Sequence, residues 1–163
     1  MKEQALHLAP FYKGWDEYQQ KLVKALAPLS QEQLDLRASG TLRSVSNLVR
    51  HIIGARARWL HYVLREDDES TFDLMEWDRP DQPTRSASEL ISALETSWRV
   101  LQNALNRWTI ADLEEILHDI GEDGEDETFT RQWVIWHLIE HDLHHGGEFS
   151  FLLGMHDLPG IDL

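Results

Sequence analysis

The chain has 163 residues, no cysteine, and fifteen basic against twenty-nine acidic residues, which give a formal net charge of −14 at pH 7. This length suffices for one domain with a substantial hydrophobic core, so we expect residues 1–163 to form a single domain. The absence of cysteine excludes disulfides and thiolate metal ligands, and any metal ion must be held by nitrogen and oxygen atoms. The strong negative charge would repel a phosphate backbone, so nucleic acid is not an expected partner.

Residues 1–20 contain several charged side chains and no long apolar run. We therefore expect neither a secretory signal nor a membrane span, and a cytoplasmic protein. The first helix is predicted from about Trp15 to a stop near Pro28, and the pattern Ser30-Gln-Glu-Gln33 predicts a short helical turn after it.

A second helix is predicted from about Ser44 to Arg65. One face carries the mostly apolar residues Leu48, His51, Ile52, Ala55, Trp59 and Tyr62. The other side carries Arg50 and Arg58, which we expect on an outer surface. Residues 67–85 are predicted to be a long loop, because they contain acidic residues followed by two prolines and no sustained periodicity.

The third helix opens at the capping-box pattern Ser86-Ala-Ser-Glu89 and continues through Leu105, and residues 109–112 predict a short extra helix. Residues 119–127 are strongly acidic, but their spacing does not fit the calcium loop of an EF-hand, and we predict a solvated acidic loop. Thr130 is expected to cap a fourth helix that ends before Pro159. Four such helices without a convincing strand pattern predict an all-α four-helix bundle.

Within the fourth helix, His141 and His145 are four residues apart, so both imidazoles leave the same helix face and can converge on one metal ion. They share that face with apolar residues, whereas Glu140 and Asp142 are expected to point to the sides. A buried histidine pair hydrogen-bonded to backbone or carboxylates is the alternative interpretation. Taken alone, the spacing does not decide between the two.

His51 lies midway along the apolar face of the second helix and in a bundle can face His141 and His145. Three inward histidines on two helices favour a metal site. His137 and His144 also have chelating spacings, but the whole row cannot bind one ion because Cα atoms eight helical residues apart are separated by about 12 Å. We expect His137 and His144 to support the site or the helix.

Two further features accompany the last histidine. Two glycines inside a helix, Gly146 and Gly147, cost about 1 kcal/mol each relative to alanine, which close helix packing, room beside a ligand or an early helix end would explain. The apolar residues that follow favour continuation of the helix. Glu148 could orient a ligand, act as a general base or bind the metal, but a plain helix-end carboxylate is the favoured interpretation.

The segment Arg43-Ser-Val-Ser-Asn-Leu-Val-Arg-His51-Ile-Ile-Gly-Ala and the segment Trp136-His-Leu-Ile-Glu-His141-Asp-Leu-His-His145-Gly-Gly-Glu together resemble the histidine motifs of the DinB/YfiT-like superfamily. Their order and separation match as well, and the resemblance covers most of the chain. It implies an up-down-down-up four-helix bundle, a homodimer, and a divalent metal ion held by His51, His141 and His145. It does not imply DNA binding.

The chain departs from the family pattern after the last histidine. The family often has His-Arg-Gly followed by Gln, whereas this chain has His145-Gly-Gly-Glu148, which removes an arginine that could contact an anion or a thiol cofactor. Three neutral imidazoles suit zinc, nickel, iron(II) or manganese and leave positions open for water or substrate. No residue outside the metal ligands is assigned a catalytic role.

The resemblance implies metal-assisted chemistry on a small molecule, and we therefore predict a metal-dependent transferase or hydrolase. An open metal site could bind an external thiol as the thiolate, so a low-molecular-weight thiol is a candidate partner. One alternative is a non-enzymatic metal-binding or stress-associated interaction protein in which the ion stiffens the bundle. Another is a bundle without metal that holds an apolar ligand in the same cavity.

Overall fold

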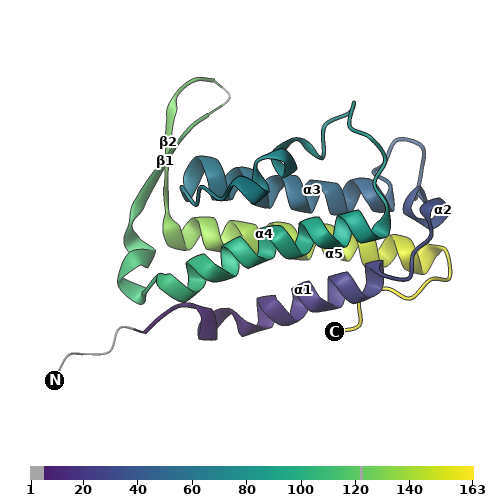
Figure 1. Ribbon diagram of the computed structural model, residues 1–163, viewed down its shortest axis with the longest axis horizontal. Helices are drawn as coiled ribbons and strands as arrows, with labels where there is room; N and C mark the ends of the chain where they lie inside the picture. Colours follow the sequence, from purple (N-terminus) through teal and green to yellow (C-terminus); the bar gives the residue numbers. More distant parts are fainter. Residues whose placement is uncertain (1–5, 122) are drawn as a thin grey trace.

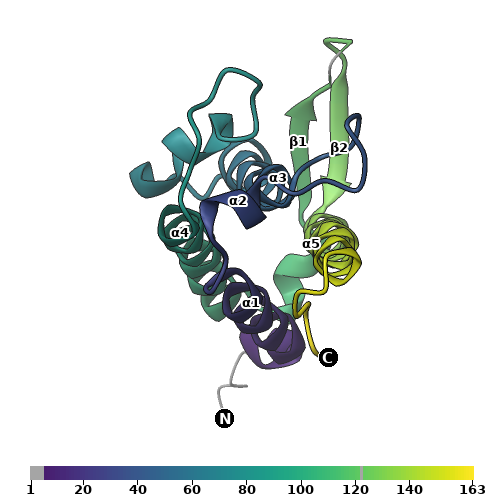
Figure 2. The ribbon, with the colours of Figure 1, turned by 90° about the vertical axis from the view of Figure 1, so that its right-hand side faces the viewer.

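The computed structural model describes residues 6–121 and 123–163. Four long helices form its body: α1 (Lys13–Leu26), α3 (Val45–Arg58), α4 (Ala87–Arg107) and α5 (Arg131–Met155). In Figure 1, α3 and α4 run in one direction and α1 and α5 in the other, and the end-on view in Figure 2 shows the four around a common core. This arrangement confirms the up-down-down-up four-helix bundle.

Side-chain caps fix the helix starts that the sequence predicted. The Ser30 hydroxyl accepts from the backbone N–H of Gln33 and opens the short helix α2 (Gln31–Leu34). Ser44, Ser86 and Thr130 do the same for α3, α4 and α5. Because a cap satisfies an N–H group that has no partner within the helix, these short polar residues are strong local start signals. The short helix expected near residue 110 is also present, as a 3₁₀ helix over Ile110–Glu114.

The connection between α3 and α4 is more ordered than a loop. The chain leaves α3 through a π-helical turn, Trp59–Val63, and then forms two 3₁₀ helices, Glu69–Thr71 and Asp73–Glu76. This segment lies over α3, where the guanidinium groups of Arg50 and Arg58 donate to backbone carbonyls at Trp77 and Met75. The prediction of an outer surface for these two arginines is therefore wrong, because a segment distant in sequence covers them.

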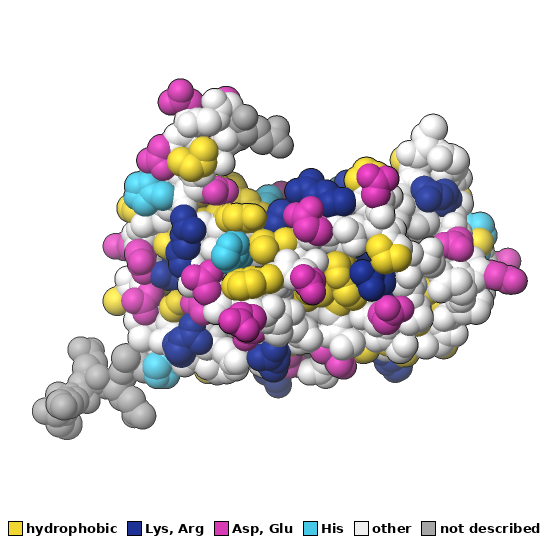
Figure 3. All heavy atoms as spheres, turned by 45° about the horizontal axis from the view of Figure 1, so that its top comes forward, with side chains coloured by type: hydrophobic (Ala, Val, Ile, Leu, Met, Phe, Trp, Pro, Cys, Tyr) yellow, Lys and Arg dark blue, Asp and Glu magenta, His cyan; other side chains and the backbone are white. Residues whose placement is uncertain are grey.

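The prediction of a solvated loop over residues 119–127 is also wrong, because both ends of this range lie in strands. Its ends belong to an antiparallel hairpin of β1 (Ile116–Ile120) and β2 (Asp126–Thr130), with Ile116 opposite Thr130 and Ile120 opposite Asp126. Gly124 has φ +82°, a left-handed conformation that glycine adopts without steric cost. Figure 3 shows the hairpin standing out at one end of the body, while acidic and basic side chains are interspersed over the rest of this face.

The bundle core, which is mostly apolar, encloses a buried ion pair. Arg56 of α3 and Asp142 of α5 both have fully buried side chains, and the Arg56 NH2 group lies 2.7 Å from Asp142 Oδ2. Trp15 of α1 donates its indole N–H to the same carboxylate, and Gln19 accepts from the guanidinium. Asp142 was expected at the side of its helix, and this expectation is wrong because Arg56 gives it a partner inside the core. Among the described residues, no helix has the length and apolar character that crossing a bilayer requires.

Candidate metal centre

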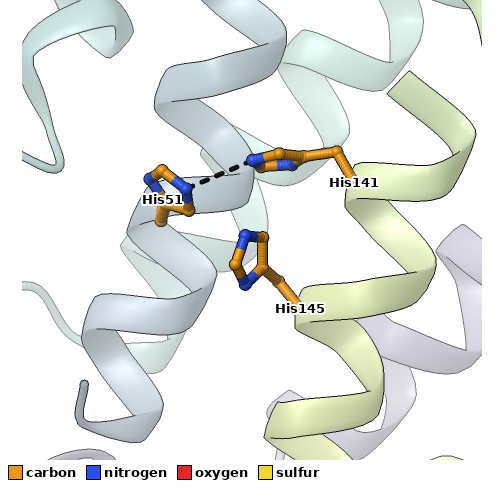
Figure 4. A group of neighbouring side chains, drawn as sticks. All are labelled: His51, His141 and His145. Atoms are coloured by element: carbon orange, nitrogen blue, oxygen red, sulfur yellow. Dashed lines mark hydrogen bonds between the residues drawn. The ribbon is translucent and has the colours of Figure 1, made fainter. Parts of the chain in front are cut away.

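The facing surfaces of α3 and α5 bring together His51, His141 and His145, as Figure 4 shows. The Nε2 atoms of His51 and His141 are 3.2 Å apart, and the three ring centroids are 4.5 to 4.8 Å from one another. Within the described residues, one candidate ligand atom from each histidine lies within 4.8 Å of the other two. These are the three side chains predicted from the sequence, and they come from two helices although His51 and His141 are 90 residues apart in the chain.

The spacing fits nitrogen atoms that share one ion. Two imidazole nitrogens at about 2.0–2.1 Å from a tetrahedral zinc ion would be separated by ~3.3 Å, close to the 3.2 Å between His51 and His141. Without an ion, the two Nε2 atoms can share only one proton in a hydrogen bond. The residues present therefore fit a divalent metal ion, with the third candidate nitrogen, from His145, within 4.8 Å of the other two.

His51 is oriented by Asp78, a residue that the sequence pattern did not indicate. The Nδ1 atom of His51 lies 2.9 Å from Asp78 Oδ2. A proton on Nδ1 therefore leaves the lone pair of His51 Nε2 facing the other histidines. Arg58 holds the same carboxylate with two hydrogen bonds of 2.8 Å. Gly54 leaves room for it, since a Cβ atom there would lie 2.8 Å from Asp78 Oδ1. The carboxylate is thus fixed by groups on the same helix face as His51.

Asp78 remains ionised in this environment. Burial alone would raise the pKa of its carboxyl group, but the hydrogen bonds from Arg58 and His51 outweigh burial and hold the pKa well below its usual range. No local sequence signal could have identified Asp78, because it follows the second 3₁₀ helix in a segment without periodicity. Only the packing of that segment on α3 brings it to His51.

His145 has a carboxylate partner from its own helix. Its Nδ1 atom lies 2.6 Å from Glu148 Oε2, which leaves Nε2 free to bind a metal. Since α5 continues to Met155, Glu148 is not at a helix end, and the favoured interpretation of it as a helix-end carboxylate is wrong. The structure instead gives it the orienting contact that was one of the alternatives.

His141 is the most perturbed of the three. Burial, with smaller contributions from the neighbouring His145 and His51, lowers its pKa to about 3, so its imidazole is neutral at physiological pH. Burial also lowers the pKa of His145, although Glu148 opposes this effect. Neutral imidazoles offer the lone pairs that metal binding requires. Among the described residues, the buried Nδ1 atom of His141 has no hydrogen-bond partner.

The two other histidines of this helix lie outside the triad. His137 stacks on Trp133 with ring centroids 5.1 Å apart, and Trp133 in turn stacks on Phe129 of β2, so this row attaches the hairpin to α5. His144 is exposed and lies 3.8 Å from Glu148. Together with His145 and Glu148 it forms a second group of candidate ligand atoms, which shares His145 with the triad.

The two glycines after His145 have different surroundings. A Cβ atom on Gly146 would lie 2.1 Å from the hydroxyl oxygen of Tyr18 in α1, whereas one on Gly147 would have no neighbour within 4 Å. Close helix packing therefore explains Gly146, and the helix continues through both glycines as expected. No cationic side chain could occupy position 146 without displacing α1.

Comparisons with known proteins agree with the fold described above. A family model described as the DinB superfamily matches residues 15–149. A solved DinB-like protein from Bacillus cereus superposes with a TM-score of 0.77 at 21% sequence identity, covering 98% of this chain and 99% of that one. A DinB-like protein from Bacillus subtilis superposes with a TM-score of 0.63 at 16% identity, covering 90% and 91%. No curated protein matches the chain significantly.

Proposed function

The chain belongs to the DinB superfamily, and from this premise we propose that His51, His141 and His145 hold one divalent metal ion for a transferase or hydrolase reaction on a small molecule. The observation that carries the proposal is the convergence of three imidazoles, two of which are oriented through their second nitrogen by Asp78 and Glu148. Carboxylate partners of this kind fix the tautomer of metal-binding histidines in many metalloproteins.

A metal ion with three histidine ligands and an open position supplies a Lewis acid that lowers the pKa of a bound water or thiol. The protein's own groups would keep His141 neutral by burial and fix the orientation of His51 and His145 through Asp78 and Glu148. Zinc, nickel, iron(II) and manganese all suit the ligands. A low-molecular-weight thiol is the candidate co-substrate, since a metal ion can bind it as the thiolate.

The test compares the metal content of the purified protein with that of single alanine variants. His51→Ala, His141→Ala and His145→Ala should each lose bound metal in elemental analysis after reconstitution and gel filtration. His144→Ala is the matched control, because it changes an exposed histidine next to His145 on the same helix. Retention of metal by all three triad variants would contradict the proposal, as would an equal loss in His144→Ala.

A second candidate is a non-enzymatic protein in which the ion stabilises the bundle. It is favoured by the position of the triad, which joins α3 to α5 and would cross-link two helices. The melting temperature distinguishes the two, because a structural ion contributes folding free energy directly. Metal loss with little change in melting temperature supports the enzyme, and unfolding on chelation supports the structural role.

A further inference from the structure

An apolar cavity lies beside the triad. It has a volume of about 220 Å³ and is formed by the segment before α3 and the facing surface of α5; its lining residues are Ala38, Leu42, Arg43, Leu48, Glu148, Phe151 and Leu152. Leu48 precedes His51 by one helical turn, and Glu148 contacts His145. Two of the lining residues thus connect the cavity to the triad, Glu148 by direct contact with His145 and Leu48 by its place one turn before His51 on α3.

The size and lining suit the apolar part of a small ligand. An engineered apolar cavity of about 150 Å³ in another protein takes up benzene, so this cavity can hold a group somewhat larger than a benzene ring. Small-molecule sites usually combine such apolar walls with a few polar groups that fix orientation. Here the polar groups are Arg43 and Glu148.

Arg43 is the group that gives the cavity a charge preference. Across residues 6–121 and 123–163, no carboxylate lies within ion-pair distance of it, although most arginines of this acidic chain have such a partner, including Arg58 and Arg79. A free guanidinium at an apolar cavity matches a carboxylate, which it can bind through two parallel hydrogen bonds. Position 146 cannot supply a cation, because Tyr18 occupies the space beside it.

Glu148 sets the direction in which such a ligand would bind. Its carboxylate faces the triad through His145 and would repel a second anion at that end of the cavity. The anionic group of a ligand is therefore favoured at Arg43, which leaves the remainder of the molecule directed toward the histidines.

A second hollow contains more arginines but is a weaker anion site. It lies between the hairpin and the segment over α3, and its lining includes Arg58, Arg65, Arg79 and the carboxylates of Asp119 and Asp126. Arg58 is already bound to Asp78, and Arg79 lies 3.4 Å from Glu76. Two carboxylates in the lining further reduce the positive potential there.

We infer that the cavity beside His145 is the substrate pocket of the proposed metal site, and that it takes a small carboxylate with an apolar body whose carboxylate pairs with Arg43. This inference rests on the proposed function for the role of the ligand as a substrate. The binding itself depends only on the cavity and Arg43, so it can be tested with and without metal.

The test measures the binding of 3-phenylpropanoate by ligand-observed NMR titration, with the neutral 3-phenylpropanamide as a matched probe. The carboxylate should bind about tenfold more tightly than the amide, and Arg43→Met should remove this preference. Leu42→Asp, which puts a negative charge on an exposed side chain of the lining, should weaken carboxylate binding similarly. Arg65→Met, in the second hollow, should leave it unchanged.

The same titration on the metal-free protein and on His141→Ala, which lacks one proposed metal ligand, separates this inference from the proposed function. Binding of the carboxylate to metal-free protein that still depends on Arg43 supports the pocket even if the triad binds no metal. Binding that requires metal and is indifferent to Arg43→Met means that the carboxylate binds the ion directly, and this overturns the inference. Equal binding of the acid and the amide, or an equal effect of Arg65→Met, overturns it as well.

Discussion

Replacing Gly146 with alanine should destabilise the protein, whereas the same change at Gly147 should stabilise it. Both glycines lie inside α5, and in a helix interior alanine is favoured over glycine by about 1 kcal/mol. At Gly147 nothing opposes this gain, because the new Cβ atom has no neighbour within 4 Å. The free energy of unfolding of Gly147→Ala should therefore rise by about 1 kcal/mol.

At Gly146 the new Cβ atom would lie 2.1 Å from the Tyr18 hydroxyl oxygen and 2.9 Å from the Tyr18 Cζ atom. Tyr18 is only 7% exposed, so its ring cannot turn away into solvent, and α1 or the ring must shift. Such overpacking costs about 1–3 kcal/mol. Because the helix-propensity gain is common to both variants, the difference between their unfolding free energies measures this clash directly and should be about 1–3 kcal/mol.

Urea unfolding monitored by circular dichroism gives the free energy of unfolding of both variants under the same conditions. Adding Tyr18→Phe to Gly146→Ala lengthens the shortest contact to the 2.9 Å of the Cζ atom and should recover part of the lost stability, which a double-mutant cycle isolates. Equal stabilities of Gly146→Ala and Gly147→Ala, or no coupling to Tyr18→Phe, would refute the assignment of Gly146 to helix packing.

Asp142→Asn should lower the free energy of unfolding by about 3–5 kcal/mol in urea titrations, because it leaves the fully buried Arg56 guanidinium without its counter-charge; a loss below about 1 kcal/mol would contradict this. Asp78→Ala should weaken metal binding by about 10–100-fold in competition with a chelator, and unchanged affinity would exclude an orienting role. In the metal-free protein the pKa of His141 is about 3 when folded and 6.5 in the unfolded chain, so the unfolded state binds more protons between these values. Stability should therefore fall as the pH drops from 6.5 toward 3, and less steeply in His141→Gln, as unfolding curves at each pH would show. The family resemblance predicts a homodimer, and Leu143 belongs to an exposed apolar side of α5. Light scattering should give the mass of a dimer for the wild type and a smaller mass for Leu143→Asp. A monomeric wild type would contradict the prediction.

Local signals sufficed for most of the helices. Short polar residues such as Ser86 and Thr130 identify helix starts because a cap is a contact within a few residues. The hairpin was missed because its strands have only five residues each and β2 begins with Asp126 and Glu127, residue types that are depleted in strands. The dipeptide Asp123-Gly124, a common hairpin-turn signal, could have identified it.

The site was predictable in part. His141 and His145 share a helix face by periodicity, and His51 lies on the one face of its helix that a bundle can bury. Asp78 and Arg43 could not be found in this way. Asp78 lies in an irregular segment and reaches His51 only because that segment packs against α3. Arg43 lies in another irregular segment, and it lines a cavity that this segment forms together with α5.

The sequence by itself determined the helices, their caps and the helix faces that carry the three histidines, because these depend on contacts between residues three to four positions apart. The tertiary structure alone decided which charged groups are buried and paired. Arg56 meets Asp142 across eighty-six residues, and the segment before α4 brings Asp78 to His51. Periodicity assigns a side chain to a face of its own helix, but only the neighbouring elements determine whether that face meets solvent, core or another charge.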